Sequence, residues 1–268
     1  MRLSGMAFVL AALLSPGLLA AHEFWIEPQA FAVAPGAPLV ADLRVGEKLE
    51  GARYGYVPPN FTRFDVLLGG AAHPVEGRPG DRPALSMPVE GSGLAVVVHV
   101  TRDYKLTYNS WDKFESFLAD KNLSWVAARH DARGLPRDSL RERYSRHAKS
   151  LIAVGDGQGA DREAGLLTEI VAQANPYTDD LSGGLPVRVL YRGAPRADTQ
   201  VAVFARDPGG AVSVATYRTD AGGRAVIDVA PGHVYLVDSV VMRELAVSGP
   251  NDPAWESLWA SLTFRVPE

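Results

Sequence analysis

The chain has 268 residues, a formal net charge of -4 at pH 7 and no cysteine. This charge argues against a general nucleic-acid binder, because such proteins need a basic surface to displace counterions. The lack of cysteine excludes disulfides, thiolate metal sites and cysteine nucleophiles, so a transition-metal site must use histidine, carboxylates, methionine or the backbone. The length suits one large domain or two ordinary ones.

Residues 1–21 have the pattern of a secretory signal peptide. An arginine precedes an apolar run at residues 6–14, and Ala20 and Ala21 are small residues suited to peptidase cleavage. We expect cleavage after Ala21, with cleavage after Ala20 as the alternative. The run is too short to cross a bilayer, which takes about 20 apolar residues, and no later segment of that length is free of charge. The sequence therefore predicts export to the periplasm of a Gram-negative bacterium, with no transmembrane segment in the mature chain.

Residues 22–105 predict an N-terminal β-sandwich. Short apolar runs alternate with turn residues, as in all-β domains. The expected strands lie at residues 38–45, 63–68, 84–89 and 94–100.

Residues 106–160 predict a helical insert and linker. Ser110 can cap a helix that carries Trp111, Phe114 and Phe117 on one face. A second helix is expected at residues 138–152, because apolar residues there recur at a helical spacing. A glycine-rich linker follows.

Residues 161–268 predict a second β-sandwich, of immunoglobulin-like or transthyretin-like type. A glycine-containing turn at residues 218–224 separates two of its strands. Trp255 and Trp259 lie four apart, so a short helix before the last strand would place them on one side. The expected strands are residues 185–191, 199–204, 212–217, 225–229, 234–241 and 262–266.

His22 carries the main functional signal. Cleavage after Ala21 would make it the first residue of the mature protein. Its free α-amine and its Nδ1 could then close a chelate ring on one metal ion, which no interior histidine can do alone. A second imidazole would complete a nitrogen-rich set that suits copper or nickel.

Three other histidines are candidates for that second imidazole: His99, His147 and His233. For His99 the alternative is a strand histidine bonded to a backbone carbonyl or to solvent. For His147 it is a core histidine satisfied by one hydrogen bond. For His233, after Pro-Gly, it is a turn residue, while His73 and His130 fall in polar loops.

Other site motifs are weak or missing. The chain has no HExxH motif for a zinc hydrolase and no nucleophile elbow. The glycine-rich stretch at residues 155–159 lacks the ending of a phosphate-binding loop. Asp179 and Asp180 could bind calcium, although a solvated turn is the alternative.

Three stretches together resemble one family: residues 22–28, residues 143–149, and residues 185–193 with the turn at 219–224. The resemblance is to an exported bacterial domain of unknown function, often described as a periplasmic component of nickel or cobalt uptake. It covers nearly all of the mature chain and implies that His22 is a metal ligand. Some nickel-type relatives have Gly-His where this chain has Gly46-Glu47, so Glu47 stands where a nitrogen ligand would be.

We therefore expect periplasmic binding or handling of nickel, cobalt or copper, in support of metal uptake with a membrane or outer-membrane transporter as partner. The metal-site candidates are His22, His99, His147 and Glu47. One alternative is a non-catalytic envelope β-sandwich that docks partners without metal. Another is a copper enzyme with a two-histidine brace.

Overall fold

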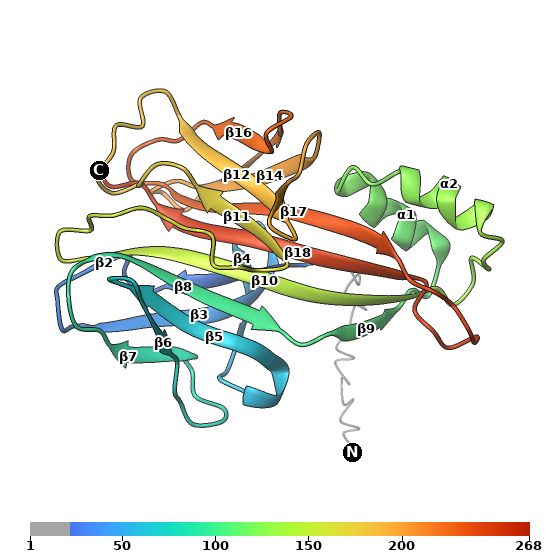
Figure 1. Ribbon diagram of the computed structural model, residues 1–268, viewed down its shortest axis with the longest axis horizontal. Helices are drawn as coiled ribbons and strands as arrows, with labels where there is room; N and C mark the ends of the chain where they lie inside the picture. The colour runs from blue at the N-terminus through green and yellow to red at the C-terminus, as the bar shows by residue number, and fades with distance from the viewer. Residues whose placement is uncertain (1–21) are drawn as a thin grey trace, which may run out of the picture.

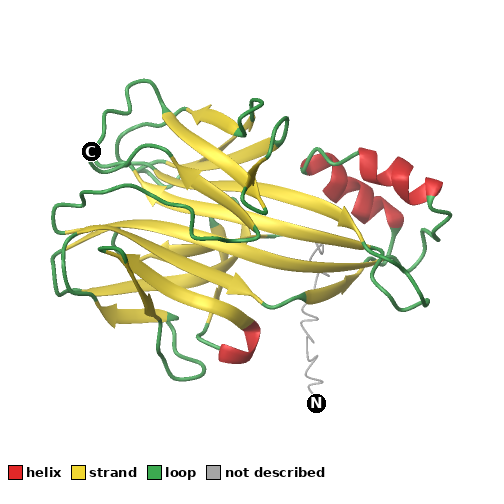
Figure 2. Cartoon of the chain, in the orientation of Figure 1, coloured by secondary structure: helices red, strands yellow, loops and turns green. Residues whose placement is uncertain are grey.

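The computed structural model describes residues 22–268 (Figure 1). The expected signal peptide and its cleavage site lie outside these residues. The described chain consists mainly of strands in several packed sheets, with two α-helices at one end (Figure 2), which confirms the predicted mainly β class. Neither helix has the length and apolarity needed to cross a bilayer.

A ten-stranded central sheet runs through the whole molecule. It joins strands from both predicted halves, because β10 pairs with β18 on one side and with β8 on the other. The main path, in spatial order, is β15 (Val212–Arg218), β14 (Gln200–Arg206), β17 (Val234–Glu244), β18 (Trp255–Arg265), β10 (Arg141–Val154), β8 (Gly93–Thr101), β5 (Phe61–Leu68) and β6 (Ala71–Pro74). Two short strands, β2 (Ala32–Val33) and β9 (Tyr104–Thr107), also pair with β10.

Two four-stranded sheets pack against the central sheet. The N-terminal sheet contains β1 (Glu23–Pro28), β3 (Pro38–Glu47), β4 (Glu50–Tyr54) and β7 (Leu85–Pro88). The C-terminal sheet contains β11 (Thr168–Ala172), β12 (Leu185–Tyr191), β13 (Ala194–Pro195) and β16 (Arg224–Ile227).

The two outer sheets cover opposite faces of the central sheet. Side chains alternate along a strand, and β8 shows the consequence. Val96 and Val98 join the core under the C-terminal sheet, whereas Ala95 and Val97 join the core under the N-terminal sheet. Each face of the central sheet therefore has its own core.

The helices α1 (Trp111–Asp120) and α2 (Trp125–Ala132) lie at the ends of β17 and β18 (Figure 1). The first helix begins directly after Ser110, as predicted, although the serine side chain makes no capping hydrogen bond. Phe117 of α1 stacks on Trp259 of β18, with ring centroids 5.6 Å apart. A single 3-10 turn, Pro58–Asn60, precedes β5.

The helix expected at residues 138–152 is wrong, because this segment forms the central strand β10. The spacing of its apolar residues fits a helix. In the structure, however, most of its residues are buried, because the strand is covered on both faces of the sheet. Its polar side chains find partners on other strands and loops. Glu142 accepts a hydrogen bond from Tyr108, and the Lys149 ammonium pairs with Asp161 at 2.8 Å.

Trp255 and Trp259 lie on β18 and not on the short helix that was one possibility for them. Their shared side is correct, because residues four apart also share one face of a strand. That face packs against the helices, with Trp125 edge-on to Trp255.

Candidate functional site

His22 and Glu47 lie opposite each other across the first pair of antiparallel strands. The register pairs Glu23 with Gly46, so the next pair outward is His22 with Glu47. The His22 Nδ1 atom lies 3.2 Å from the Glu47 Oε1 atom, and the two side chains are 38% and 56% exposed. The geometry is not that of a hydrogen bond, and Nδ1 has no hydrogen-bond partner among residues 22–268.

The turn that carries Glu47 is strained and firmly anchored. Lys48 and Leu49 join β3 to β4 with φ angles of 51° and 61°, which place two non-glycine residues in the left-handed region. A two-residue turn of this kind costs roughly 1–2 kcal/mol per residue. Leu49 is buried in a cluster with Trp25, Phe204 and Leu236, which offsets the cost and fixes the turn on the central sheet.

Two glycines allow β3 and β4 to approach closely beside this turn. Gly46 faces Gly51 in the register, and a Cβ atom at either position would overlap the backbone of the other strand. The position of Glu47 therefore depends on its glycine neighbour.

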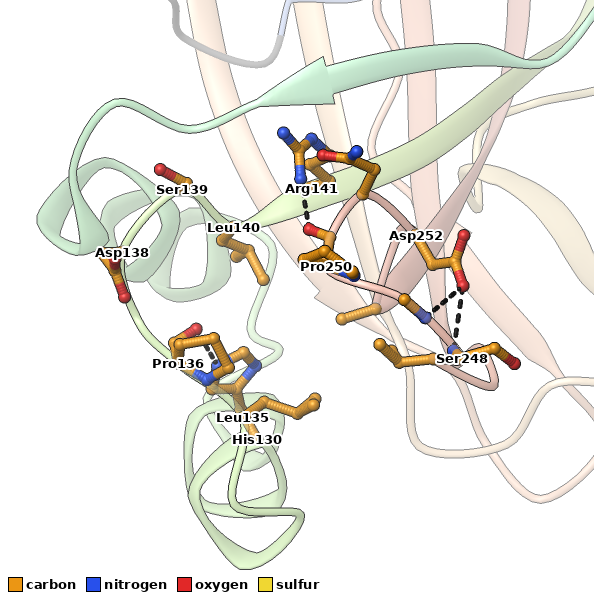
Figure 3. A pocket seen from close by; sticks show the side chains of 14 residues that line it. His130, Leu135, Pro136, Asp138, Ser139, Leu140, Arg141, Ser248, Pro250 and Asp252 are labelled. Carbon is orange, nitrogen blue, oxygen red and sulfur yellow. Dashed lines mark hydrogen bonds between the residues drawn. The ribbon is translucent and has the colours of Figure 1, made fainter.

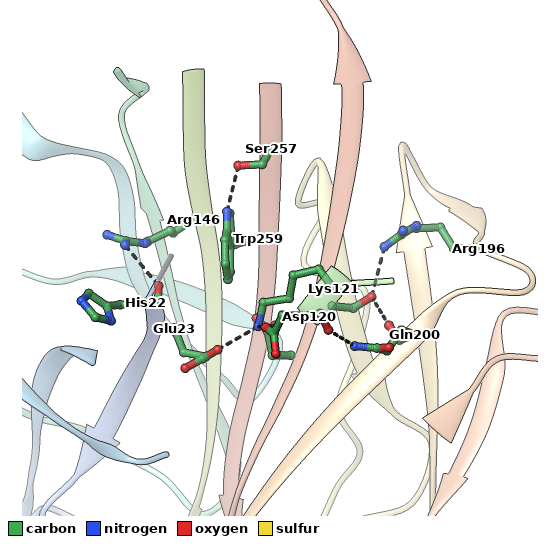
Figure 4. A network of polar contacts seen from close by, with 11 residues as sticks. His22, Glu23, Asp120, Lys121, Arg146, Arg196, Gln200, Ser257 and Trp259 are labelled. Atoms are coloured by element: carbon green, nitrogen blue, oxygen red, sulfur yellow. Dashed lines mark hydrogen bonds and ion pairs between the residues drawn. The ribbon is translucent and has the colours of Figure 1, made fainter. Parts of the chain in front are cut away.

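Arg146 holds the backbone of His22. Its guanidinium donates a hydrogen bond to the His22 carbonyl at 3.3 Å, as Figure 4 shows. It also lies over the rings of Phe24 and Tyr144, at 5.7 and 5.1 Å from their centroids. Burial lowers the pKa of Arg146 below its ordinary value.

Lys121, at the end of α1, joins three carboxylates next to His22. Its Nζ lies 2.8 Å from Glu23 and 3.1 Å from Asp120, both of which Figure 4 shows. It also lies 3.4 Å from Asp238. Burial acts to lower the pKa of Lys121, but the carboxylates outweigh it and the pKa is raised. Burial raises the pKa of Asp238 to about 7, against the opposing effect of Lys121. This network ties β1, α1 and β17 together.

His99 lies in the core beneath the N-terminal sheet. Its ring is surrounded by those of Phe24, Phe61 and Phe64, with centroids 4.9 to 5.4 Å away. Burial lowers its pKa to about 3, so the imidazole is neutral. His99 is therefore a core histidine that packs on Phe24.

His147 lies on the opposite face of the central sheet from His22. Its neighbour Arg146 reaches the His22 carbonyl, and strand alternation turns His147 toward the C-terminal sheet. There its Nε2 is 3.2 Å from the Ser145 hydroxyl, and burial lowers its pKa to about 4. The structure thus brings Glu47, but not His147, to His22.

The remaining histidines and acidic candidates occupy local structural roles. His233 contacts the Pro231 carbonyl in its turn, and Asp180 accepts a bond from the backbone of Ser182. His130 is buried in α2 and accepts a hydrogen bond from the Trp255 indole. Among residues 22–268, no three histidine, aspartate or glutamate side chains are grouped to hold a metal ion.

A cavity of about 630 Å³ lies at the far end of the helices, between the loop after α2 and the loop between β17 and β18 (Figure 3). Some of its polar groups contact one another. Arg141 donates to the Pro250 carbonyl, and Asp252 accepts from the backbone of Ser248 and Gly249.

The sequence did not reveal the roles of Arg146, Lys121 or Asp238. All three are ordinary charged residues in the sequence, and only the packing of distant strands brings them beside His22. The one signal in the sequence is a single basic residue within an apolar strand pattern. Many surface strands share this pattern, so it does not single out a functional residue.

Comparison with known families agrees with the resemblance of the three stretches. A family model described as a domain of unknown function, DUF4198, matches residues 19–243, which is most of the chain. No curated protein sequence matches the chain.

Proposed function

We propose that this chain, which belongs to the DUF4198 family, binds a divalent transition metal at His22 and handles it in the periplasm. Nickel, cobalt and copper are the candidate ions. The observation that carries the proposal is the unpartnered Nδ1 of His22 at 3.2 Å from the Glu47 carboxylate.

A shared cation would make this contact favourable. The lone pair of a neutral Nδ1 and a carboxylate oxygen repel each other, and a metal ion bound by both would turn that repulsion into attraction. If cleavage makes His22 the first residue, its amine adds a donor next to Nδ1. The amine, the imidazole and Glu47 would then form a set of two nitrogens and one oxygen, which suits copper(II) or nickel(II).

The surrounding structure supports preorganised binding. Arg146 holds the His22 carbonyl, and buried Leu49 holds the turn that presents Glu47. Donors on rigid elements lose little freedom when they bind, so less of the binding free energy is spent on ordering them. Export and delivery to a membrane or outer-membrane transporter are part of this proposal.

A two-histidine copper brace has less support. It needs a second imidazole facing His22, and the residue directly opposite is Glu47 instead. We therefore favour binding and transfer of the metal over oxidation chemistry.

Calorimetry with nickel and copper tests the proposal. Protein that starts at His22 should bind one ion per chain, whereas the same protein with its N-terminal amine acetylated should bind at least about tenfold more weakly, because an acetylated amine cannot donate to the metal. Glu47→Gln should weaken binding in the first protein and have little effect in the second. Equal binding by both proteins, or by neither, would refute the chelate.

A further inference from the structure

A lysine and two carboxylates are buried together between β10 and β11. Lys149 points to the same face of β10 as Leu151, which belongs to the core under the C-terminal sheet. The Lys149 Nζ atom lies 2.8 Å from Asp161, in the loop before β11, and 3.0 Å from Glu169 on β11. The side chains of Lys149 and Asp161 are 0% exposed, and that of Glu169 is 2% exposed. Water therefore has no access to the three charged groups in the folded chain.

Burial favours the neutral forms of the Lys149 and Asp161 side chains. Moving a charged group out of water is unfavourable, and attraction to a partner offsets this only when the geometry is good. Burial raises the pKa of Asp161 above its ordinary value, against the opposing effect of Lys149. A proton passed from the ammonium to the carboxylate leaves an amine beside a carboxylic acid. These are the two reactants of an amide condensation.

The carboxyl group of Asp161 is held as an electrophile. Its Oδ1 accepts a hydrogen bond from the backbone of Arg162 at 2.8 Å, and its Oδ2 accepts one from the backbone of Ala172 at 2.9 Å. Backbone N–H groups in a dry site stabilise negative charge that develops on such oxygens when the carbon is attacked. The fold also keeps the amine and the acid in contact, so their reaction needs no bimolecular encounter.

Glu169 is placed to move protons between the two groups. Its Oε1 accepts hydrogen bonds from the Lys149 Nζ at 3.0 Å and from the backbone of Ala164 at 2.6 Å, and its Oε2 accepts one from the backbone of Leu166 at 3.2 Å. The two backbone contacts fix the carboxylate beside the amine. This geometry is the one that a general acid–base needs, because the group lies within hydrogen-bond distance of the proton it transfers.

We propose that Lys149 and Asp161 condense to an intramolecular amide, with Glu169 as the general acid–base. The Nζ lone pair attacks the Cγ atom of the neutral Asp161 carboxyl group. Glu169 takes a proton from the nitrogen and passes it to the leaving hydroxyl, so a C–N bond replaces a C–O bond and one water departs. An ammonium and a carboxylate thus become a neutral amide and water, and Glu169 is unchanged.

The amide ties β10 of the central sheet to the loop that leads into the C-terminal sheet. The chain has no cysteine, so this bond supplies a covalent link of the kind that disulfides give to many exported proteins. The proposal is independent of metal binding at His22.

Mass spectrometry of tryptic peptides from the folded mature chain tests the proposal. Trypsin should not cleave after an acylated Lys149, so residues 147–162 should remain one peptide. This peptide should be lighter than its sequence by one water, and fragments from cleavage between Lys149 and Asp161 should be missing, because the amide closes a ring there. The result does not depend on where the mature chain begins.

Three variants separate the steps. Asp161→Asn should give the same peptide mass as the wild type, because an asparagine releases ammonia and leaves the same bond. Glu169→Gln, whose folding circular dichroism would check, should lose most of the crosslink because its amide cannot take up the proton. Lys149→Arg is the control, since it keeps the charge but cannot form the amide. A succinimide at Asp156-Gly157 would also remove one water, and it would persist in Lys149→Arg.

Full-mass wild-type peptides that end at Lys149 would overturn the proposal. Loss of water that persists in Lys149→Arg, or a different peptide mass from Asp161→Asn, would overturn it as well. An undiminished crosslink in folded Glu169→Gln would contradict the role given to Glu169.

Discussion

The ammonium of Lys121, the residue directly after α1, lies 2.8 Å from the Glu23 carboxylate on β1, in a buried contact that joins the helices to the N-terminal sheet. Asp238 of β17 shares the same ammonium at 3.4 Å. The residue next to His22 is thereby fixed to two other elements, which holds the start of β1 in place.

Lys121→Met should destabilise the fold strongly. The change would leave Glu23 and Asp238 buried without their cation, which costs about 3–5 kcal/mol when one partner of a buried pair is removed. Chemical denaturation at neutral pH measures the free energy of unfolding. Lys105→Met, at an exposed position, is the control, and an equally small effect of both changes would contradict the role given to Lys121.

Leu49→Ala should weaken metal binding without altering a donor. Leu49 is 2% exposed, and truncating a buried leucine costs about 2–5 kcal/mol. Its loss frees the strained turn, so Glu47 should be held less firmly opposite His22. Calorimetric nickel affinity and unfolding free energy should both fall, whereas the exposed Val226→Ala should change neither. An unchanged nickel affinity in Leu49→Ala would show that burial of Leu49 is not needed to hold Glu47 in place.

Glu142 should make the protein less stable as the pH rises toward neutral. Burial raises its pKa from 4.5 to about 7, despite hydrogen bonds from Ser257 and Tyr108. Its folded pKa is above the unfolded one, so its contribution is fully present below pH 4.5 and is lost as the pH rises through 7. Glu142→Gln should remove up to roughly 3 kcal/mol of this loss. Denaturation curves of the wild type and of Glu142→Gln between pH 4.5 and 7 measure this difference. The same pH profile in both proteins would contradict burial of a charged Glu142.

His99 should act in the opposite direction at acidic pH. Burial lowers its pKa from 6.5 to about 3, so the neutral imidazole stabilises the fold above pH 6.5 and this contribution is lost as the pH falls toward 3. His99→Asn should flatten the acid side of the stability profile, whereas His73→Asn on exposed β6 should leave it unchanged. An unchanged acid slope in His99→Asn would show that the imidazole is already protonated in the fold.

The sequence predicted the mainly β fold because its short apolar runs and turns are local signals. It also singled out His22 and, through the family resemblance, Glu47, although their contact depends on the register between β1 and β3. It failed at β10, where helical spacing of apolar residues coincides with a strand buried on both faces. It could not place His147, because the face on which a strand residue lies is visible only once the strand is recognised.

Electron paramagnetic resonance of the copper(II)-loaded protein tests the central claim most directly. Protein that starts at His22 should show superhyperfine coupling to two nitrogens, the amine and Nδ1, and Glu47→Gln should shift the spectrum by altering the oxygen donor. The same spectrum from the chain with an acetylated N-terminal amine, or a spectrum insensitive to Glu47→Gln, would contradict a metal site built from these two residues.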